Sequence, residues 1–316
     1  MECETGVRAS HRCHLRLIVS IRFTVFTATY NRREVISRVY ESLSAQTIPD
    51  FEWLVVDDGS TDATTDQIAQ WQHSAPFPIT YVCRPHQGKH RAYNDALGEA
   101  RGEFFTVLDS DDAIVPNALE RFLFHWDSIP DGERRRYSGV TCLCMDEAHH
   151  VVGRPFPTEV LDCRHYEAAF RFRARGEKWG FHRTAVLREF PFPEIPGETF
   201  CPEGVVWNRI ARRYLVRHVN EPLRIYFAQP GGLTDRIRHV LISNPQYARL
   251  FYRESMQLDV PAWSKVKWAI NYIRYSLHAR APLSQAIAHS SRPVLTSALL
   301  LAGCGYYAAD RLRTEE

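Results

Sequence analysis

Two acidic clusters follow apolar runs in the first third of the sequence. Asp57–Asp62 ends the run Phe51–Val56, and Asp109–Asp112 follows the run Phe104–Leu108. In an open α/β sheet, ligands bind beyond the carboxyl ends of the strands, so carboxylates from two such strands can converge on one ligand. Crowded carboxylates repel one another unless a divalent cation and ligand hydroxyls lie between them. The pattern predicts a cation-assisted site for a hydroxyl-rich ligand such as a sugar.

The spacing within the second cluster favours metal binding. Asp109 and Asp111 are two residues apart, so in an extended backbone both point the same way and can reach one hard cation or the nucleotide that carries it. Each cluster taken singly is equally consistent with an ordinary turn and a helix N-cap, because Asp, Ser, Thr and Gly favour those positions. Two clusters, each directly after a strand, favour a ligand site over two independent turns.

The composition bounds the class of protein. The 316 residues are 45% hydrophobic, which is enough for one large core, or for a principal domain with an appended helical region. The net charge of +2 gives no sign of a nucleic-acid partner. The eight cysteines include no C-x-x-C pair, which argues against a zinc ribbon and favours reduced thiols in the cytosol.

The chain shows no targeting or membrane-spanning segment. Residues 1–20 contain only a short apolar stretch, too brief for a signal peptide, and we expect them to be a disordered extension or to lie upstream of the true start. No segment reaches the roughly twenty apolar residues of a membrane-spanning helix.

Hydrophobic periodicity predicts alternating strands and helices up to about residue 125, then short strands among proline-rich loops to about residue 230. Beyond Asn244 the pattern is helical. The strands expected in the first part are Ile21–Ala28, Phe51–Val56, Ile79–Cys83 and Phe104–Leu108, and those expected in the second are Tyr137–Met145 and Val151–Arg154, with a helix at Val205–Tyr214.

Five stretches resemble, in the same order, family 2 of the glycosyltransferases, whose members have the GT-A fold. They are Phe26–Arg32, Ser42–Thr47, Val55–Asp62, Gly88–Ala96 and Gly102–Asp112. The resemblance implies a GT-A-type, Rossmann-like α/β fold, with a mixed, mainly parallel sheet flanked by helices and a C-terminal helical extension. It implies a nucleotide-sugar-binding half at 21–115, an acceptor-binding half at 116–244 and a helical region at 245–316.

The resemblance also implies roles for individual residues around a nucleotide-sugar donor. Thr27 and Tyr30 would line the nucleobase pocket, and Asp58 would hydrogen-bond the base or its ribose. The donor would be positioned by Lys89, Arg91 and Asn94. Asp109 would contact the ribose or sugar, and together with Asp111 it would bind Mn²⁺ or Mg²⁺ on the diphosphate. The alternatives are that Tyr30 is an aromatic at a helix start and that Arg91 lies on a solvated helix face, the second being nearly equal to the donor role. His218 and His239 are candidates for a third metal ligand.

The catalytic base that the resemblance implies for an inverting transfer is an acidic residue at a helix start. Glu203 is the candidate in the segment Gly197–Gly204, although Gly204 stands where the family usually has a second acid. A Glu at a helix N-terminus also stabilises the helix dipole without any catalytic role, and Glu198 is the substitute candidate. Arg236 and Arg238, after the last expected core strand, would either close over the diphosphate or form a solvated basic turn.

We therefore expect a metal-dependent inverting glycosyltransferase that moves a sugar from a nucleotide donor, UDP-linked, to a glycan or lipid-linked acceptor in cell-surface polysaccharide synthesis. One alternative is a sugar-1-phosphate nucleotidyltransferase, which requires a glycine-rich loop that Thr27–Arg32 lacks. The other is a catalytically silent nucleotide-sugar-binding or scaffold protein, which the incomplete acidic pair at Glu203 leaves open.

The C-terminal region carries a mixture of basic and aromatic residues that suits a membrane interface. An apolar stripe from Trp263 to Leu277 has lysines and arginines beside it, and a second apolar stretch follows at Val294–Ala309. We expect cytoplasmic protein with peripheral contact through 262–309 to the inner face of the cell membrane. Ordinary packing of these helices on the core is an equal alternative, since apolar stripes of this period most often face a core.

Overall fold

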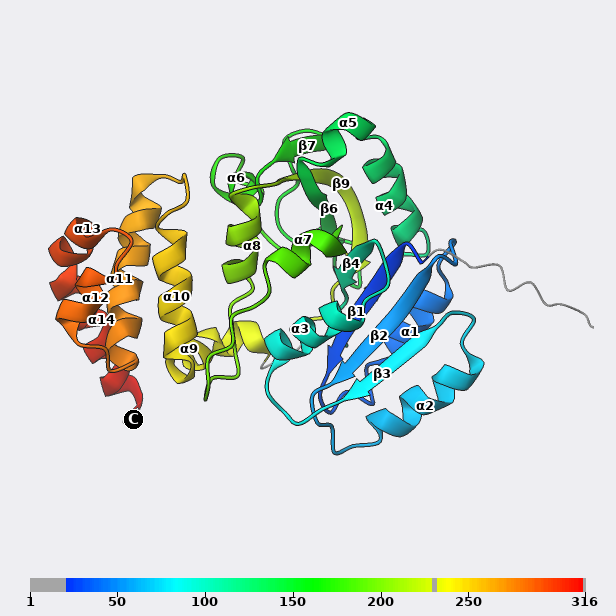
Figure 1. Cartoon of the computed structure of the whole chain (residues 1–316), viewed down its shortest axis with the longest axis horizontal. Helices are drawn as coiled ribbons and strands as arrows, with labels where there is room; N and C mark the ends of the chain where they lie inside the picture. The colour runs from blue at the N-terminus through cyan, green and yellow to red at the C-terminus, as the bar shows by residue number, and fades with distance from the viewer. Residues whose placement is uncertain (1–20, 229–231, 315–316) are drawn as a thin grey trace, which may run out of the picture.

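The computed structural model describes residues 21–228 and 232–314 (Figure 1). The extension expected at 1–20 lies outside the described residues. In the N-terminal part, strands and helices alternate as the periodicity predicts. The elements are β1 (Phe23–Thr29), α1 (Ser37–Ser44), β2 (Phe51–Asp57), α2 (Thr64–Ser74), β3 (Ile79–Cys83), α3 (Lys89–Glu99), β4 (Phe104–Val107) and the two-residue β5 (Ala113–Ile114).

The second part completes the sheet. Its elements are α4 (Ala118–Asp127), α5 (Asp131–Arg134), β6 (Tyr137–Met145), β7 (Val160–Cys163), α6 (His165–Phe170), β8 (Lys178–Arg183), α7 (Thr184–Glu189), α8 (Gly204–Ala211) and β9 (Leu215–Ile225). The strand expected at Val151–Arg154 is wrong, because only Val151 forms an isolated bridge, to Met145. The sequence analysis missed β8, a short strand that lies at the centre of the sheet between β4 and β6.

The strands form one nine-stranded sheet in the order β3-β2-β1-β4-β8-β6-β9-β5, with β7 paired to β9. β3, β2, β1 and β4 are mutually parallel, with Phe23 opposite both Phe51 and Phe104. β8 is antiparallel to both of its neighbours, so β6 and β9 run the same way as the first four strands. The sheet is therefore mixed and mainly parallel, as the resemblance implied, and the carboxyl ends of β1, β2 and β4 lie at one edge.

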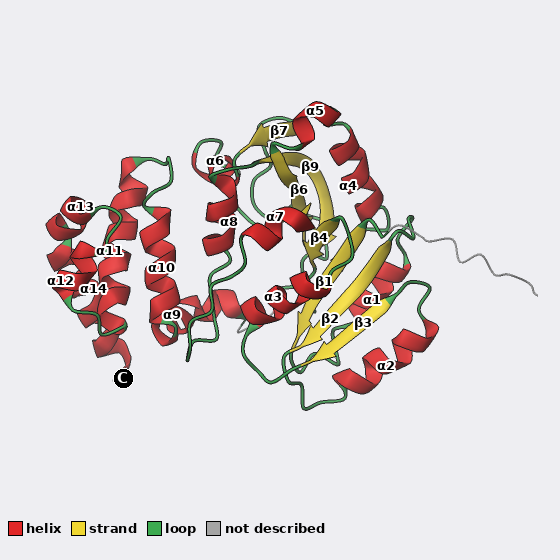
Figure 2. Ribbon diagram, viewed as in Figure 1, coloured by secondary structure: helices red, strands yellow, loops and turns green. Residues whose placement is uncertain are grey.

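Helices cover both faces of the sheet (Figure 2). Along β1 and β2, alternate side chains enter different cores, because successive residues of a strand point to opposite faces. Phe23, Trp53 and Val55 pack with α1, α2 and α4 on one face. Phe26 and Leu54 pack with α3, α7 and α8 on the other. The strand ends that carry the acidic clusters are thus fixed from both sides.

The C-terminal region is helical, as expected, and it extends away from the sheet at one end of the molecule (Figure 1). It comprises α9 (Leu233–Ser243), α10 (Pro245–Ser255), α11 (Ala262–His278), α12 (Leu283–Ala288), α13 (Pro293–Ala298) and α14 (Leu300–Thr314). Within the described ranges, no helix has the length and hydropathy needed to cross a membrane.

The boundary expected at 244/245 stays a prediction, and Tyr247 of α10, just after it, is fully buried in the core that α3 and α8 form on the sheet. One expectation for this region needs correction. Most of the stripe on α11 is packed rather than available to a membrane, since Tyr272 and Ile273 are fully buried and α11 lies against α10 and α14, whereas Trp263 at its start is 49% exposed. Apolar periodicity cannot distinguish the two cases, because a protein core and a lipid surface select the same side chains.

Candidate active site

An aromatic pair and a buried carboxylate lie at the ends of β1 and β2. The rings of Tyr30 and His86 are 4.5 Å apart between centroids and 33° from parallel. Asp58 accepts the backbone N–H groups of Gln87 and Gly88, each at 2.8 Å, and its Oδ2 lies 2.9 Å from Nδ1 of His86. Asp58 therefore fixes the loop before α3 through these hydrogen bonds. Tyr30 is 45% exposed, so its ring is accessible to a ligand from solvent.

His86 was missed by the sequence analysis. It lies in the polar loop between β3 and α3. A lone histidine in such a loop does not by itself indicate a binding site, and its contact with Tyr30 exists only in the folded chain.

The D-x-D segment Asp109–Asp111 follows β4, and a hydrogen bond from Thr27 fixes the residue before it. The Thr27 hydroxyl donates to the carbonyl of Leu108 at 2.8 Å and accepts from Nε1 of Trp53 at 3.0 Å. Thr27 is fully buried, so its expected place in the lining of the nucleobase pocket is wrong. Its hydroxyl is used inside the sheet, where it fixes the backbone immediately before Asp109.

Lys89 joins the two sides of the candidate site. Its Nζ donates to Oδ1 of Asp109 at 2.6 Å and to Oε1 of Glu203 at 2.9 Å. Burial alone would raise the pKa of Asp109, but the charges of Lys89 and Arg224 lower it to about 2. Burial would lower the pKa of Lys89, and the two carboxylates outweigh burial and raise it above its ordinary value. The ammonium thus stays charged and holds two carboxylates, 94 residues apart in the sequence, at one place.

The loop before α3 can approach Glu203 only because residue 88 is glycine. Gly88 has φ +98°, and a Cβ there would lie 1.9 Å from the carbonyl oxygen of Thr199. A side chain would therefore have to displace the backbone of the segment that leads to Glu203. Gly88 therefore permits the close approach of the loop that carries Lys89 to the segment that carries Glu203.

Glu203 occupies the N-cap position of α8 with its side chain 51% exposed, and it makes no capping hydrogen bond. Its Oε2 lies 3.4 Å from Nε1 of Trp207, which stacks on His182. A cavity of about 130 Å³ lies beside it, with Lys89, Tyr93 and Trp207 in its mainly apolar lining. Lys89 and Trp207 hold the carboxylate at the mouth of this cavity instead of on the helix N-terminus. The geometry favours a chemical role over the helix-dipole role.

Glu198, the substitute base, has a different task. It is 5% exposed, and its carboxylate accepts the backbone N–H groups of Gln246 at 2.7 Å and Tyr247 at 2.9 Å, at the start of α10. Burial raises the pKa of Glu198 above its ordinary value, and these two N–H groups work in the opposite direction. Both oxygens are committed to the helix start, so Glu198 is a cap and not a base.

Other expected donor contacts are directed elsewhere. The amide of Asn94 bonds the backbone of Phe192 in both directions, at 2.9 Å, and also donates to Glu194. Arg91 contacts Gln87 and the carbonyl of Ile195. In the structure both side chains fasten the 192–195 segment to α3 and do not meet Asp109 or Asp111. Of the donor contacts expected from α3, only Lys89 points into the site.

The acidic cluster is balanced by arginines from distant elements. Arg224 of β9 is buried, with Nε 3.2 Å from Oδ2 of Asp112 and Nη1 3.9 Å from Oδ2 of Asp109. Burial raises the pKa of Asp112 to about 7 against the opposing effect of Arg224. Arg32 lies 3.9 Å from Asp111, the other carboxylate of the motif. The sequence analysis assigned Arg224 no role, because only the sheet brings β9 next to β5.

The remaining histidine and arginine candidates do not join this site in the described structure. His218 is 2% exposed, bonds Thr141 at 2.5 Å, and has its pKa lowered to about 3 by burial. His239 and Arg236 are exposed on α9 and, among the residues that the structure describes, neither pairs with a carboxylate of the acidic cluster. Arg238 pairs with Asp310 of α14 at 2.6 Å, and its expected closure over a diphosphate stays a prediction.

The donor set at Asp109 and Asp111 fits an open cation site. Carboxylate oxygens are the ligands that Mg²⁺ and Mn²⁺ prefer, and such ions commonly keep a few protein ligands and complete their shell with phosphate and water. The low pKa of Asp109 keeps it ionised. Among residues 21–228 and 232–314 no group of three or more His, Cys, Asp or Glu forms a closed metal cage. These carboxylates thus suit an ion that arrives with a diphosphate.

Residues 24–173 match the family described as Glycosyl transferase family 2. The chain belongs to this family. A relative from Campylobacter jejuni, GalNAc(5)-diNAcBac-PP-undecaprenol beta-1,3-glucosyltransferase, is 31% identical over 210 residues, which are 65% of this chain and 64% of the relative. Curated relatives are matched over 14 to 65% of their own length.

Solved structures share the whole fold at low sequence identity. Staphylococcus aureus TarS 1-349 in complex with UDP-GlcNAc has a TM-score of 0.58 at 17% identity, covering 93% of this chain and 92% of TarS 1-349. The Pyrobaculum calidifontis mannosyltransferase PcManGT, in complex with GDP-Man and Mn²⁺, has a TM-score of 0.53 at 21% identity, covering 93% and 82%. The likeness extends through the C-terminal helices and supports the fold expected from the sequence.

Proposed function

We propose that this family 2 protein is a metal-dependent inverting glycosyltransferase that transfers a sugar from a UDP-sugar to a glycan or lipid-linked acceptor in cell-surface polysaccharide synthesis. One observation carries the proposal. Lys89 holds Asp109 of the D-x-D segment and Glu203, the only acid at the mouth of the adjacent cavity, on a single ammonium. A donor-side carboxylate and a base across from it are the two parts that an inverting transfer needs.

The donor would lie along the carboxyl ends of β1, β2 and β4. The Tyr30–His86 pair offers an aromatic surface for the base, next to the loop that Asp58 holds. The ribose and diphosphate would then reach Asp109 and Asp111. The UDP-GlcNAc complex of the TarS neighbour, which shares the fold, supports a uridine donor.

Asp109 and Asp111 would hold Mn²⁺ or Mg²⁺ on the diphosphate. A bound ion of this kind neutralises charge that builds on the leaving group and needs no change of redox state. The Mn²⁺ complex of the PcManGT neighbour supports this choice of cation. Arg32 and Arg224, at 3.9 Å from these carboxylates, add positive charge to the same place.

Glu203 would accept the proton of the acceptor hydroxyl while that oxygen attacks the anomeric carbon on the face opposite the diphosphate. Its half-exposed carboxylate and the adjoining apolar cavity leave room for an acceptor sugar. Lys89 would pair with Glu203 in the resting enzyme and turn toward the donor phosphates once they bind beside Asp109, which its ammonium already contacts.

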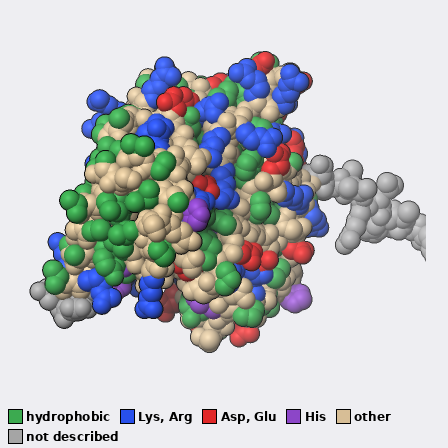
Figure 3. Space-filling view, turned by 60° about the vertical axis from the view of Figure 1, so that its left-hand side comes forward, with side chains coloured by type: hydrophobic (Ala, Val, Ile, Leu, Met, Phe, Trp, Pro, Cys, Tyr) green, Lys and Arg blue, Asp and Glu red, His purple; other side chains and the backbone are tan. Residues whose placement is uncertain are grey.

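The acceptor proposal includes contact with a lipid surface through α13 and α14. Val294, Leu301 and Leu312 are 84, 88 and 68% exposed, and Figure 3 shows hydrophobic side chains gathered over the C-terminal helices. Arg292 and Arg311 border this face, which gives the pattern of an interfacial helix on anionic lipid. We therefore place the face on α13 and α14 and not on α11, because most of the α11 stripe is packed.

The membrane proposal is tested with vesicles containing anionic lipid at low salt. We expect the full chain to co-sediment, and the exposed-site variant Val294→Asp/Leu301→Asp to stay in the supernatant. Phe124→Asp, which changes a 57% exposed side chain on α4, is the matched control and should bind like the unchanged protein. Equal binding of all three proteins would refute the assignment. A chain cut near residue 244 is unsuitable, because it lacks Tyr247 and the rest of α10.

The catalytic proposal is tested by incubating the purified protein with a panel of nucleotide sugars, with Mn²⁺ or with EDTA, and measuring release of the nucleotide diphosphate. We expect release from a UDP-sugar that depends on the divalent ion and is accelerated by an acceptor glycan. Binding of a UDP-sugar without any turnover would favour the silent scaffold instead. A thermal-shift screen of the same panel identifies the donor, since a ligand of the folded state raises the melting temperature.

A further inference from the structure

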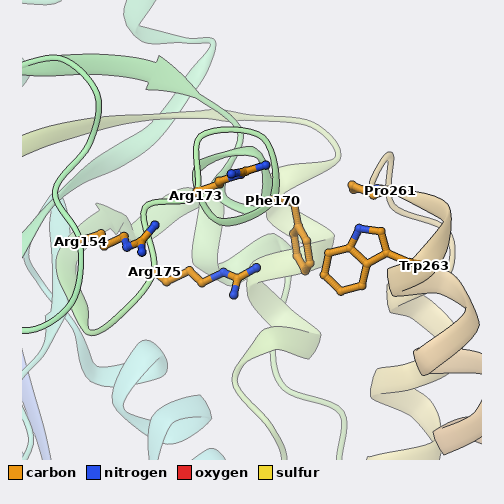
Figure 4. A pocket seen from close by; sticks show the side chains of 6 residues that line it. All are labelled: Arg154, Phe170, Arg173, Arg175, Pro261 and Trp263. Atoms are coloured by element: carbon orange, nitrogen blue, oxygen red, sulfur yellow. The ribbon is translucent and has the colours of Figure 1, made fainter.

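A second pocket, separate from the residues described so far, lies between the loop after α6 and the start of α11 (Figure 4). Its volume is about 430 Å³, within the range of small-molecule sites. Three arginines, two aromatic rings and one proline line it. They are Arg154, Phe170, Arg173, Arg175, Pro261 and Trp263.

The arginines of this pocket have no acidic partner. None of the three guanidinium groups forms a salt bridge with a carboxylate of the described chain, whereas the arginines around the D-x-D segment and Asp310 do. Uncompensated like charges around one cavity repel one another. Guanidinium groups bind phosphate and carboxylate oxygens with paired, charge-assisted hydrogen bonds, so an anion is the occupant that the lining favours.

The loops that carry the arginines are fixed against each other. Gly153 has φ +93° and Gly176 has φ +100°, and a Cβ on Gly176 would lie 2.5 Å from Cα of Gly153. The backbone N–H of Arg154 also donates to the carbonyl of Arg175 at 2.7 Å. The two glycines permit a contact between backbones that no side chain would allow. Arg154 and Arg175 are therefore held at one rim of the cavity before any ligand arrives.

The opposite rim is aromatic. The rings of Phe170 and Trp263 are 6.4 Å apart between centroids, and Figure 4 shows Arg175 extending toward Phe170. Trp263 is 49% exposed although its helix is otherwise well packed. A flat apolar surface beside cationic groups suits a sugar that carries an anionic group, since the ring can pack on the aromatic face while the anion meets the guanidinium groups.

The pocket is linked to the candidate active site by two short structural paths. Glu177, two residues after Arg175, lies 3.5 Å from Arg224, which neighbours Asp109 and Asp112. On the other side, α6 packs against α8, whose first turn follows Glu203. Because α8 has eight residues, its length is about 12 Å. An acceptor whose growing end lies at Glu203 could place a part a few sugar units away in the pocket.

We propose that this pocket is an acceptor subsite for a phosphate group, carried either by a diphosphate that links the glycan to a lipid or by a phosphodiester within the glycan. The proposal rests on the proposed glycosyltransferase function for the meaning of the site, but not for the binding of phosphate itself. Binding can therefore be tested without turnover.

The first experiment measures binding of inorganic pyrophosphate by calorimetry in EDTA, which removes divalent ions from the D-x-D segment. We expect Arg173→Gln/Arg175→Gln to bind at least tenfold more weakly than the unchanged protein, because two charge-assisted hydrogen-bonding groups are lost. Arg171→Gln, in the same loop with its guanidinium on the ring of Phe172, is the matched control and should stay within twofold. Loss of binding only in Arg32→Gln would place the phosphate at the donor site and overturn the proposal.

The second experiment identifies the source of the phosphate through acceptor kinetics. The probes are an acceptor sugar linked through a diphosphate to a short isoprenoid, a phosphodiester-linked oligomer and an uncharged glycan. We expect the double variant to raise KM at least tenfold for one of the two phosphorylated acceptors, while kcat and the KM of the uncharged glycan change less than twofold. Trp263→Ala should raise KM at least threefold for the same acceptor without affecting pyrophosphate binding. An equal KM increase for the uncharged glycan would overturn the proposal.

The two proposals can fail separately. If the unchanged protein binds pyrophosphate through Arg173 and Arg175 but transfers no sugar, the glycosyltransferase proposal fails and the phosphate site stands. If transfer occurs and the double variant binds pyrophosphate like the unchanged protein, the phosphate site fails and the glycosyltransferase proposal stands. Melting temperatures of all variants verify that each is folded, and the exposed positions of these arginines favour that outcome.

Discussion

The two carboxylates that meet at Lys89 are supported in different ways. Asp109 lies directly at the end of β4, in register with β1, and the Thr27 hydroxyl secures the residue before it. Glu203 is the last residue of the fourteen-residue segment, 190–203, that joins α7 to α8 without regular secondary structure. The candidate donor side is thus part of the sheet itself. On the candidate acceptor side, the position of Glu203 depends on the contacts that fix the loop between α7 and α8.

That loop is held by residues from the C-terminal helices. The amide oxygen of Asn244 accepts the backbone N–H groups of Thr199 and Phe200, at 2.7 and 3.0 Å. The hydroxyl of Tyr247 meets the backbone of Pro193 and Ile195 and the ring of His90. A helical region that the sequence presents as an appendage therefore positions the candidate base. The difference predicts that donor-side changes affect binding and acceptor-side changes affect turnover.

The largest expected effect is that of Glu203→Gln. We expect transfer to fall on the order of a hundredfold or more, the usual range for a lost general base, with UDP-sugar affinity close to that of the unchanged protein. Glu194→Gln, which alters an exposed acid of the same segment, is the control and should retain most activity. Steady-state transfer and calorimetry of donor binding give the two numbers. Loss of donor affinity in Glu203→Gln would mean that both carboxylates belong to the donor side.

Asp111→Asn should produce the complementary result. We expect UDP-sugar affinity measured with Mn²⁺ to fall about tenfold or more, to the level seen in EDTA, because one carboxylate ligand is removed while the fold is retained. Asp131→Asn, at a 90% exposed position remote from the site, should keep the full Mn²⁺ effect. A Mn²⁺ effect that persists in Asp111→Asn would place the cation on other residues.

Tyr247→Phe tests whether α10 positions the base. The ring remains, but the hydroxyl that meets Ile195, Pro193 and His90 is lost, which leaves buried partners unsatisfied and should cost about 1–3 kcal/mol of stability. We expect kcat to fall about fivefold with donor affinity unchanged. Tyr252→Phe on the same helix, where the ring stacks on Tyr275, is the control. Equal kcat in both variants would show that the loop keeps its position without this hydroxyl.

The smallest effect concerns pH and His90, beneath the same loop. Burial lowers the pKa of His90 to about 4 from 6.5. Above pH 6.5 the ring is neutral in the folded and unfolded states, and between 6.5 and 4 only the unfolded state takes up the proton, so stability falls as pH falls. From pH 7 to 5.5 this amounts to about 1 kcal/mol.

We expect His90→Gln to lose about 1 kcal/mol less stability than the unchanged protein over that interval, as measured by denaturant unfolding. Exposed His73→Gln should follow the unchanged protein. His182 and His218, whose pKa values burial also lowers, to about 3, remain in every variant and cancel in the comparison. Parallel curves for all three proteins would contradict a neutral, buried His90.

The sequence alone located the candidate donor side of this protein. Strands that are buried on both faces read as continuous apolar runs, so the positions of Asp58, Asp109 and Asp111 at strand ends follow from local pattern and from the rule that parallel strands share their carboxyl edge. The family motifs fall in these same segments. Lys89 and Glu203 were named because the family resemblance implies roles for residues at these two positions.

Only the tertiary structure decided how these two residues meet. Glu203 and Glu198 are five residues apart, and the local sequence does not show which of them is free to act as a base. The difference comes from α10, because its first N–H groups donate to the Glu198 carboxylate. Thr27 and Asn94 carry the family pattern, but the directions of their side chains depend on Trp53 and on the 192–195 segment. Hydrophobic periodicity shows that one face of a helix is apolar, but it does not show whether protein or another surface covers that face. The choice between core and surface for α11 and α14 therefore follows from long-range packing, which the linear sequence does not specify.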